Sequence, residues 1–408
     1  MKPQEWGEVV IGELCETIID CVNKTAPVVD FPTPYKMIRT TNVRDGWISL
    51  HSVKYVDHAT YLLWTRRQTP KKGDVILTRE APLGEVGMLR SDDKVFLGQR
   101  LVSYRVNPKK LDNRFLLYAF QGDCLRAQIK ALGSGSTVEH MRVPDAKNLK
   151  VFLPPLASQK KIGSILAAYD DLIENNTRRI EILEEMARRL YEEWFVQFRF
   201  PGHEGVEFKE SELGLIPGGW LVTELEEVVR LTMGQSPSSE FYNEVGKGLP
   251  FHQGVTGFGD YFPSNKTYCA IEARVANEGD ILFSVRAPVG RINIATEKIV
   301  IGRGVSALRS KTDHQIFLLS QLRCIFKEED SMGNGAIFKA VTKKDMQSIK
   351  LLQPFDEIIE RFELIAAPLW RQIRILSDKN TNLSKQRDLL LPKLISGEID
   401  VSDIPMPT

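Results

Sequence analysis

Two stretches of the chain carry mostly apolar side chains at alternating spacings of four and three residues. In the first stretch these positions are Ile162, Leu166, Tyr169, Ile173, Asn176, Ile180, Leu183, Ala187, Leu190 and Trp194. In the second they are Phe362, Ala366, Leu369, Ile373, Leu376, Asn380, Leu383, Arg387, Leu390 and Leu394. A seam with this period, kept over about four heptads, is typical of a coiled coil. The pattern therefore predicts two long helices.

Each seam contains one asparagine, and this suggests how the helices pair. Asn176 and Asn380 meet if the two seams are laid antiparallel and end to end. The same register places Tyr169 opposite Arg387, where a cation can lie over an aromatic ring. An alternative is that the helices are unrelated and pack on separate cores. Pro368 lies inside the second pattern, so it should kink that helix or mark a late start.

The strand-rich segments before the two helices resemble each other. GDVILTREAPLG at 73–84 parallels GDILFSVRAPVG at 279–290, and each joins an apolar strand to a proline turn. Later in each copy, VFLG at 95–98 parallels IVIG at 299–302. Short runs of Val, Ile, Phe and Tyr alternate there with turn residues, as in sheet structures. The chain is therefore expected to contain one unit of about 200 residues twice.

These patterns predict an α+β fold with an internal pseudo-two-fold repeat. Two strand-rich domains are separated by two antiparallel coiled-coil helices. We expect a first domain at 1–155, a central helix at 156–200, a linker at 201–219, a second domain at 220–354, a C-terminal helix at 355–396 and a tail at 397–408.

Composition narrows the class of protein. Hydrophobic residues make up 42% of the 408 positions, and no apolar run is long enough to span a membrane. With no signal-like start, we expect a cytoplasmic protein without membrane contact. The five cysteines form no C-x-x-C pair, so neither a metal nor another cofactor is expected. The net charge is +1, but both strand-rich segments carry a basic excess, which suits contact with phosphate.

Two kinds of enzyme lack their motifs in this chain. A DNA methyltransferase holds its flipped base with an N/D/S-P-P-Y/F loop, whereas the only Pro-Pro pair lies between Leu153 and Leu156. An ATP-driven translocase needs G-x-x-x-x-G-K-[ST], which is absent from the sequence. We therefore predict no catalytic site. A methyltransferase or nuclease with an unrecognised active site, or a coiled-coil scaffold that binds no DNA, remains the alternative.

Several longer strings resemble one known family. They are LPPLASQKKIGSILAAYDDLIENN at 153–176, LSKQRDLLLPKLISGEIDV at 383–401, GQSP at 234–237 and LPFHQG at 249–254. Together with the two strand-rich domains and two helices, they resemble the specificity subunits of type I restriction–modification enzymes. The resemblance implies that each strand-rich domain is a target recognition domain that reads half of a bipartite site on double-stranded DNA. It also implies partners: two methyltransferase (modification) subunits and restriction/translocase subunits, which carry out the chemistry.

The helix length agrees with a spacer between two half-sites. Ile162 and Trp194 are 32 residues apart in the sequence, which corresponds to about 48 Å of helix. That length matches about 14 base pairs of B-DNA.

The candidate DNA contacts are polar side chains in loops and turns. Arg, Asn and Gln can bond base edges in pairs, Glu can accept from a cytosine amine, and Gly- and Ser-rich loops suit phosphate. The candidates in the first domain are Arg39, Thr40, Thr41, Asn42, Arg79, Glu80, Arg100, Ser134, Ser136 and Thr137. Those in the second are His252, Gln253, Arg286, Arg303, Asn334 and Lys339.

Overall fold

A computed structural model describes residues 6–133, 139–327 and 340–405 of the chain. The chain forms two compact units. The first unit contains residues 1–175 and 379–408, and the second contains residues 176–378. Each unit is built around a four-stranded antiparallel sheet, and each includes part of both long helices.

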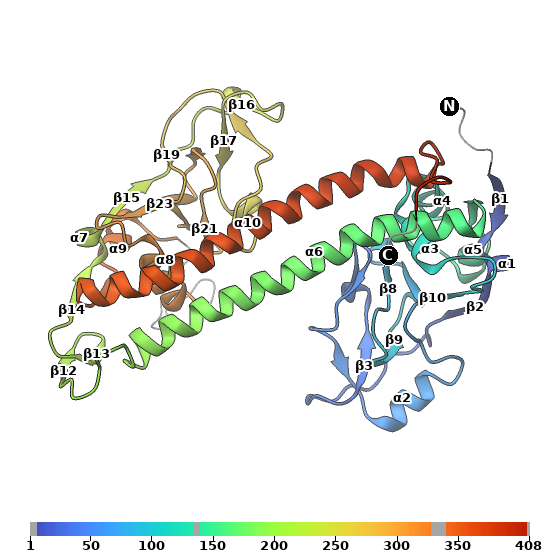
Figure 1. The fold of residues 1–408 in the computed structure, drawn as a ribbon, viewed down its shortest axis with the longest axis horizontal. Helices are drawn as coiled ribbons and strands as arrows, with labels where there is room; N and C mark the ends of the chain where they lie inside the picture. The colour runs from blue at the N-terminus through green and yellow to red at the C-terminus, as the bar shows by residue number, and fades with distance from the viewer. Residues whose placement is uncertain (1–5, 134–138, 328–339, 406–408) are drawn as a thin grey trace. The chain divides into compact units, whose positions relative to one another are not determined.

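The sheet of the first unit has the strand order β2-β10-β7-β8. Its strands are β2 (Cys15–Asp20), β10 (Leu101–Val106), β7 (Val75–Arg79) and β8 (Leu83–Met88). The helices α3 (Asn113–Gln121) and α4 (Asp123–Leu132) lie against β8 (Figure 1). A three-stranded sheet is formed by β6 (Lys54–Tyr55), β3 (Tyr35–Ile38) and β9 (Lys94–Leu97). Smaller elements are β1 (Gly7–Val10), α1 (Ile11–Leu14), η1 (Thr40–Asn42), β4 (Val43–Arg44), β5 (Trp47–Ile48), α2 (His58–Trp64), α5 (Val143–Lys147) and β11 (Lys150–Leu153).

The second unit repeats this arrangement. Its four-stranded sheet has the order β15-β23-β20-β21, formed by β15 (Val229–Met233), β23 (Val305–Ser310), β20 (Ile281–Ser284) and β21 (Ile292–Ile294). A five-stranded sheet contains β16 (Tyr242–Asn243), β18 (Tyr268–Cys269), β17 (Leu249–His252), β22 (Ile299–Ile301) and β19 (Val275–Ala276). The remaining elements are β14 (Leu221–Glu224), α7 (Leu225–Val228), η3 (Ser239–Phe241), η4 (Val255–Gly257), α8 (Gln315–Ile325), α9 (Lys343–Gln347) and β24 (Lys350–Gln353).

One inner strand of each four-stranded sheet, β7 in the first unit and β20 in the second, is buried on both faces. In β7, Val75 and Leu77 belong to the cluster that includes the helices, whereas Ile76 packs in a second cluster with Ile38 of β3. In β20, Ile281 and Phe283 likewise belong to one hydrophobic cluster and Leu282 belongs to another. Successive side chains of a strand point to opposite faces, so an uninterrupted apolar run is needed when both faces are covered.

Two segments outside the predicted domains are more structured than expected. Within 201–219, which we predicted as a linker, β12 (Phe208–Ser211) and β13 (Gly214–Pro217) form an antiparallel hairpin. In the tail at 397–408, Val401 is buried, and the backbone oxygen of Ser402 accepts a hydrogen bond from Lys161 Nζ at 2.6 Å. The tail therefore packs on the first unit.

The two long helices are α6 (Leu156–Tyr191), which continues into the π-helical η2 (Glu192–Val196), and α10 (Asp356–Ile395). In the first unit Ile162 of α6 shares a hydrophobic cluster with Leu394 of α10. In the second unit the rings of Trp194 and Phe362 lie 6.2 Å apart. Early residues of one helix thus meet late residues of the other within each unit. The late start suggested by Pro368 is wrong, because α10 already begins at Asp356.

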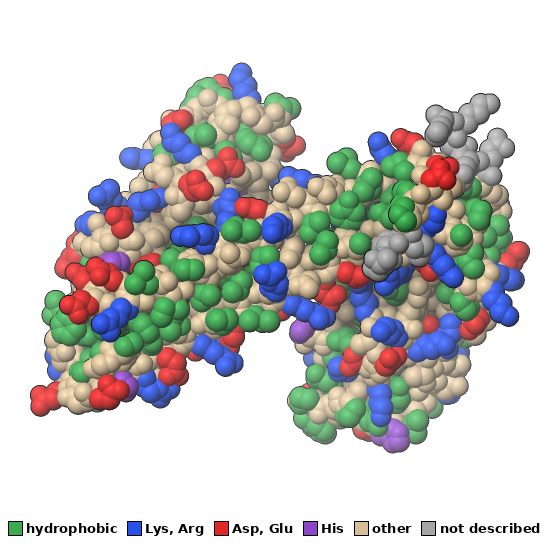
Figure 2. Space-filling model, viewed as in Figure 1, with side chains coloured by type: hydrophobic (Ala, Val, Ile, Leu, Met, Phe, Trp, Pro, Cys, Tyr) green, Lys and Arg blue, Asp and Glu red, His purple; other side chains and the backbone are tan. Residues whose placement is uncertain are grey.

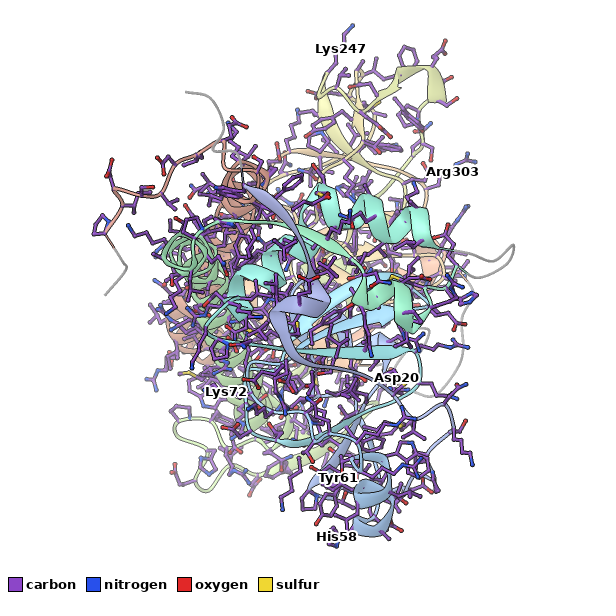
Figure 3. All side chains as sticks on the ribbon, turned by 90° about the vertical axis from the view of Figure 1, so that its right-hand side faces the viewer. Asp20, His58, Tyr61, Lys72, Lys247 and Arg303 are labelled. Carbon is purple, nitrogen blue, oxygen red and sulfur yellow. The ribbon has the colours of Figure 1, made fainter. Side chains whose placement is uncertain are left out.

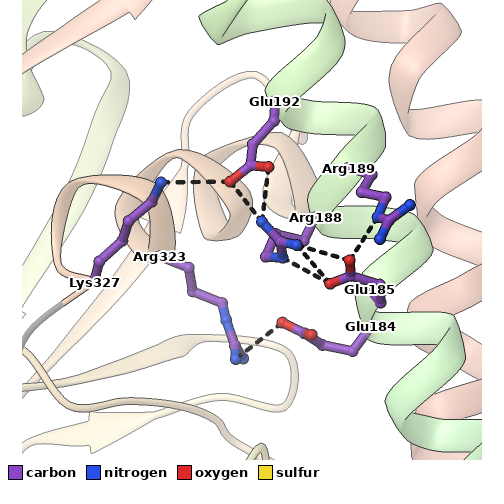
Figure 4. A network of polar contacts seen from close by, with 7 residues as sticks. All are labelled: Glu184, Glu185, Arg188, Arg189, Glu192, Arg323 and Lys327. Atoms are coloured by element: carbon purple, nitrogen blue, oxygen red, sulfur yellow. Dashed lines mark hydrogen bonds and ion pairs between the residues drawn. The ribbon is translucent and has the colours of Figure 1, made fainter. Parts of the chain in front are cut away.

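In the second unit α6 is also tied to α8 by charged side chains (Figure 4). Glu184 of α6 pairs with Arg323 of α8 at 3.4 Å, and Glu192 of η2 pairs at 3.4 Å with Lys327, which follows α8. The Arg323 guanidinium also lies 5.3 Å from the centre of the Trp370 ring of α10. Arg323 therefore connects α8 to both long helices, through an ion pair with Glu184 and a cation–π contact with Trp370.

In the first unit a buried carboxylate makes the corresponding connection. Asp170 of α6 has a side chain that is 1% exposed. It accepts hydrogen bonds of 2.6 Å from Arg387 Nη1 of α10 and from the Tyr118 hydroxyl of α3. Arg90, which follows β8, lies 3.8 Å from the same carboxylate and stacks on Trp47. Arg387 is thus paired with Asp170, the neighbour of the Tyr169 that we expected to face it.

We predict that Asp170→Ala destabilises the first unit by about 1–3 kcal/mol, because the buried Tyr118 hydroxyl loses its acceptor and Arg387 keeps only Asp388 as an ion-pair partner. The matched control is Asp171→Ala. Asp171 also pairs with Arg90, but its side chain is 51% exposed, so its loss should cost under about 1 kcal/mol. Urea unfolding of the full chain measures both. Equal effects of the two variants would contradict the role assigned to Asp170.

Candidate nucleic-acid interface

The same hydrogen-bonded turn follows the central strand of each sheet. In the first unit the Thr78 hydroxyl donates to the Pro82 oxygen at 2.6 Å and accepts from the Glu85 amide at 2.9 Å. In the second unit the Ser284 hydroxyl donates to the Pro288 oxygen at 2.6 Å. It also accepts from the amide of residue 291 at 2.8 Å. One buried hydroxyl therefore fixes the backbone of each turn.

These turns place two predicted DNA contacts in equivalent positions. Glu80 is two residues after Thr78, and Arg286 is two residues after Ser284. Each also forms an isolated backbone bridge with the segment that follows, to His140 and to Ala340, respectively. The two units thus present side chains of opposite charge at corresponding points of their folds.

In the first unit, three of the predicted residues come together beside this turn. Arg100, at the start of β10, has its Nε 3.4 Å from a Glu80 carboxylate oxygen. Arg79 points inward and donates from Nη1 to the Met141 oxygen at 3.0 Å. They line a cavity of about 500 Å³. Its other polar side chains are Asp20, Asn23, Gln99, His140 and Arg142. We call this group the first corner, and Asp20 is labelled in Figure 3.

A comparable group lies at the same end of the second unit's sheet. The Arg303 amide and Nε both lie within hydrogen-bonding distance of the Ser236 hydroxyl, at 3.1 and 3.4 Å. That hydroxyl donates to Gln253 Oε1 at 2.8 Å. Arg286 is exposed on the neighbouring turn, where the Val285 amide bonds the Gly304 oxygen. Arg303 projects outward from its loop (Figure 3). We call Ser236, Gln253, Arg286 and Arg303 the second corner.

The Arg39–Asn42 loop is organised differently from our expectation. Asn42 is 2% exposed. Its Oδ1 accepts from the Arg39 amide at 2.9 Å, and its Nδ2 donates to Ser52 Oγ at 3.3 Å. Arg39 itself donates to the Ser52 oxygen at 2.8 Å. Asn42 therefore holds the loop together and is not available to a base, whereas Thr41 is exposed and Thr40 is partly so.

His252 is likewise a structural residue. It is 5% exposed, and its Nε2 lies 2.9 Å from Asn265 Oδ1. Burial lowers the pKa of the imidazole below its ordinary value of 6.5, and the hydrogen bond with Asn265 opposes part of this shift. The neighbouring Gln253 is exposed, because β17 ends at His252 and the chain leaves the sheet there. His252, which we expected to contact DNA, is therefore buried within the fold.

Some predicted residues cannot be placed in the two corners, and the corners contain residues that we did not predict. Ser134, Ser136, Thr137, Asn334 and Lys339 fall outside the residues that the structure describes. Our sequence reasoning missed Asn23, Gln99, Arg142 and Ser236 as members of the corners. Ser236 lies in the GQSP string, which could have pointed to it, but the other three carry no local motif.

Two further kinds of site were sought in the described residues. They contain no group of three His, Cys, Asp or Glu side chains placed to hold a metal ion. No helix among the described residues is long and apolar enough to cross a membrane.

Comparison with known proteins defines the class. Residues 3–185 and 217–363 match the family described as type I restriction modification DNA specificity domain. The chain is 32% identical to the putative type I restriction enzyme MjaX specificity subunit of Methanocaldococcus jannaschii, over 98% of this chain and 95% of that protein. It is 27% identical to the MjaIX specificity subunit of the same organism, over 82% and 79% of the two chains.

One solved structure shares the fold. The type I restriction–modification S subunit from M. genitalium matches over 97% of this chain and 99% of its own, with a TM-score of 0.63 and 18% identity. The class is therefore that of proteins that confer DNA specificity. The chain belongs to the type I restriction–modification specificity subunit family, as its motifs predicted. Members of this family recognise DNA and work with methyltransferase and restriction subunits, which carry the catalytic sites.

The buried His252 gives a pH-dependent stability. Its lowered pKa means that the unfolded chain binds this proton at a higher pH than the folded chain does. Stability from this group is therefore present above about pH 6.5 and lost as the pH falls below it. We predict that His252→Asn flattens the fall in unfolding free energy between about pH 7 and pH 5. The change is at most about 1.4 kcal/mol per pH unit, the limit for one proton.

His51→Gln is the matched control, because His51 is exposed. Urea titrations at several pH values measure the slope for each variant. If His252→Asn and the unchanged chain have parallel pH profiles, His252 is not held neutral in the fold.

Proposed function

We propose that each unit reads one half of a bipartite DNA site through its corner. The observation that carries this is the equivalent placement of Glu80 and Arg286 on identically bonded turns. Both corners offer groups that can bond base edges. The first has the partly exposed Glu80 carboxylate and the exposed Arg100 guanidinium, and the second has two exposed guanidinium groups with an amide. Arg142 at the rim of the first corner adds an exposed cation suited to phosphate.

The two long helices are proposed to form an antiparallel coiled coil that sets the distance between the half-sites. The register places Asn176 opposite Asn380. Asn380 Nδ2 lies 3.4 Å from the Ile173 oxygen of α6, one turn from Asn176. The pairs Ile162–Leu394 and Trp194–Phe362 share clusters in their own units, as this register requires. The recognition domains would then comprise 1–155 and 220–354, related by a pseudo-two-fold axis.

Two copies of the methyltransferase subunit are proposed to bind, one for each unit, in the cytoplasm. The long helices carry exposed apolar side chains in both units, and Figure 2 shows hydrophobic side chains along them. In the first unit Leu172 and Leu389 are 53% and 69% exposed. In the second, Ile182 and Leu364 are 59% and 77% exposed. Exposed apolar residues that recur on both helices suit a protein partner.

The ruler can be tested by lengthening both helices together. We predict that one heptad inserted after Asn175 and another after Thr381 moves the half-sites apart by about three base pairs. Seven residues add about 10 Å of helix, and base pairs are spaced by about 3.4 Å. Both insertion points lie next to the positions where the chain passes between units. A heptad keeps the apolar period of the seam.

The spacer is read by sequencing methylated sites in cells that make the variant with its partner subunits. The half-site sequences should stay unchanged. A control with seven residues inserted between Glu212 and Leu213, in the β12–β13 turn, should keep the original spacer. A heptad variant that methylates sites of the old spacing would refute the ruler.

DNA binding by the chain itself can be tested without partners. We predict that the purified chain binds its duplex with an affinity that falls roughly 100-fold between about 50 and 200 mM salt, as four neutralised phosphates would require. It should transfer no methyl group to that duplex. A salt-independent or absent interaction would favour the scaffold alternative, and methyl transfer would favour a hidden active site.

A further inference from the structure

We propose that the two units read different kinds of base at equivalent positions: the first an amine-bearing base through Glu80, and the second a guanine through Arg286. The inference rests on the proposed function and specifies what each corner recognises. It starts from the two turns, which are held by the same hydroxyl bonds and differ in the side chain that they present.

The first corner presents an acceptor with a fixed orientation. Arg79 cannot serve as the outward contact, since its guanidinium is held by the Met141 oxygen. Glu80 keeps a side chain that is 30% exposed, and Arg100 is placed 3.4 Å from one of its oxygens. This leaves the remaining carboxylate lone pairs facing the cavity. A carboxylate accepts hydrogen bonds only.

The negative charge of Glu80 excludes a contact with the phosphates of DNA. Phosphate oxygens repel Glu80, so the residue gains nothing from the DNA backbone. In the major groove, only cytosine N4 and adenine N6 offer amine hydrogens. Glu80 therefore suits a cytosine or an adenine.

The second corner has the opposite character. Among the described residues, no carboxylate lies within ion-pair distance of the guanidinium of Arg286 or Arg303. The position that corresponds to Arg100 is Gly304, which supplies no side chain. The Ser236 hydroxyl donates to Gln253 Oε1, so the Gln253 amide nitrogen is left to donate. Guanine offers two acceptors, N7 and O6, in the major groove, and arginine can bond both.

The test uses the full chain with its methyltransferase partners and duplexes based on the site found by methylation sequencing. Glu80→Leu keeps a side chain of similar bulk and removes both acceptor oxygens. It should reduce discrimination at one base pair of the first half-site by about 5- to 150-fold, the range for a bidentate base contact. Discrimination in the second half-site should not change. Glu16→Leu, an exposed change on β2 of the same unit, is the control.

Arg286→Gln is tested with a modified base. Replacing the guanines of the second half-site one at a time by 7-deazaguanine removes the N7 acceptor. One replacement should weaken binding by the unchanged chain several-fold and should have no further effect on Arg286→Gln. Arg274→Gln, at an exposed position in the same unit, should respond to the modified base as the unchanged chain does.

Different results would contradict the assignment of bases to Glu80 and Arg286 and the proposed reading of DNA by the two corners. If Arg286→Gln weakens all duplexes equally and lowers the salt dependence by about one phosphate, Arg286 is a phosphate contact and the inference is wrong. The same holds if Glu80→Leu leaves base discrimination unchanged. If the complex shows no sequence preference in either half-site, the proposed function itself fails.

Discussion

The constraint on which this fold depends is the burial of the central strand of each sheet on both faces. In β7, alternate side chains fill two separate hydrophobic clusters, and β20 repeats the arrangement. Such a strand has no face left for polar chemistry. The polar side chains proposed to contact DNA, Glu80 and Arg286, lie where such a strand ends and the chain turns. The sheet thus positions the turns that carry Glu80 and Arg286 but contributes no exposed side chains from these two strands.

The sequence predicted those parts of the structure that depend on periodicity. The two helices, the strand-rich segments before them and the family were recognised because spacing and repeated strings reflect repeated geometry. Pro368 was harder to interpret. A proline in the first turns of a helix and one further inside look alike in sequence, and α10 extends twelve residues before it.

Single side chains were harder to predict than elements. His252 and Gln253 are neighbours of similar polarity, yet His252 is the last, buried residue of β17 and Gln253 is exposed just after it. Asn42 was a reasonable candidate for a base contact, but its amide closes its own loop. The link between Asp170, Arg387 and Tyr118 joins residues far apart in the chain. Only the packing of three elements brings them together, so no local pattern could have revealed it.

The hydroxyl-anchored turns separate two tasks that often conflict in one loop. Thr78 and Ser284 hold the backbone, while the side chain two residues later takes no part in that bonding. A change at the second position alters the surface at little cost to folding. Single substitutions at this position can therefore produce chains that fold normally and present a different side chain at the surface. A protein family that confers DNA specificity can therefore vary this surface and keep its fold.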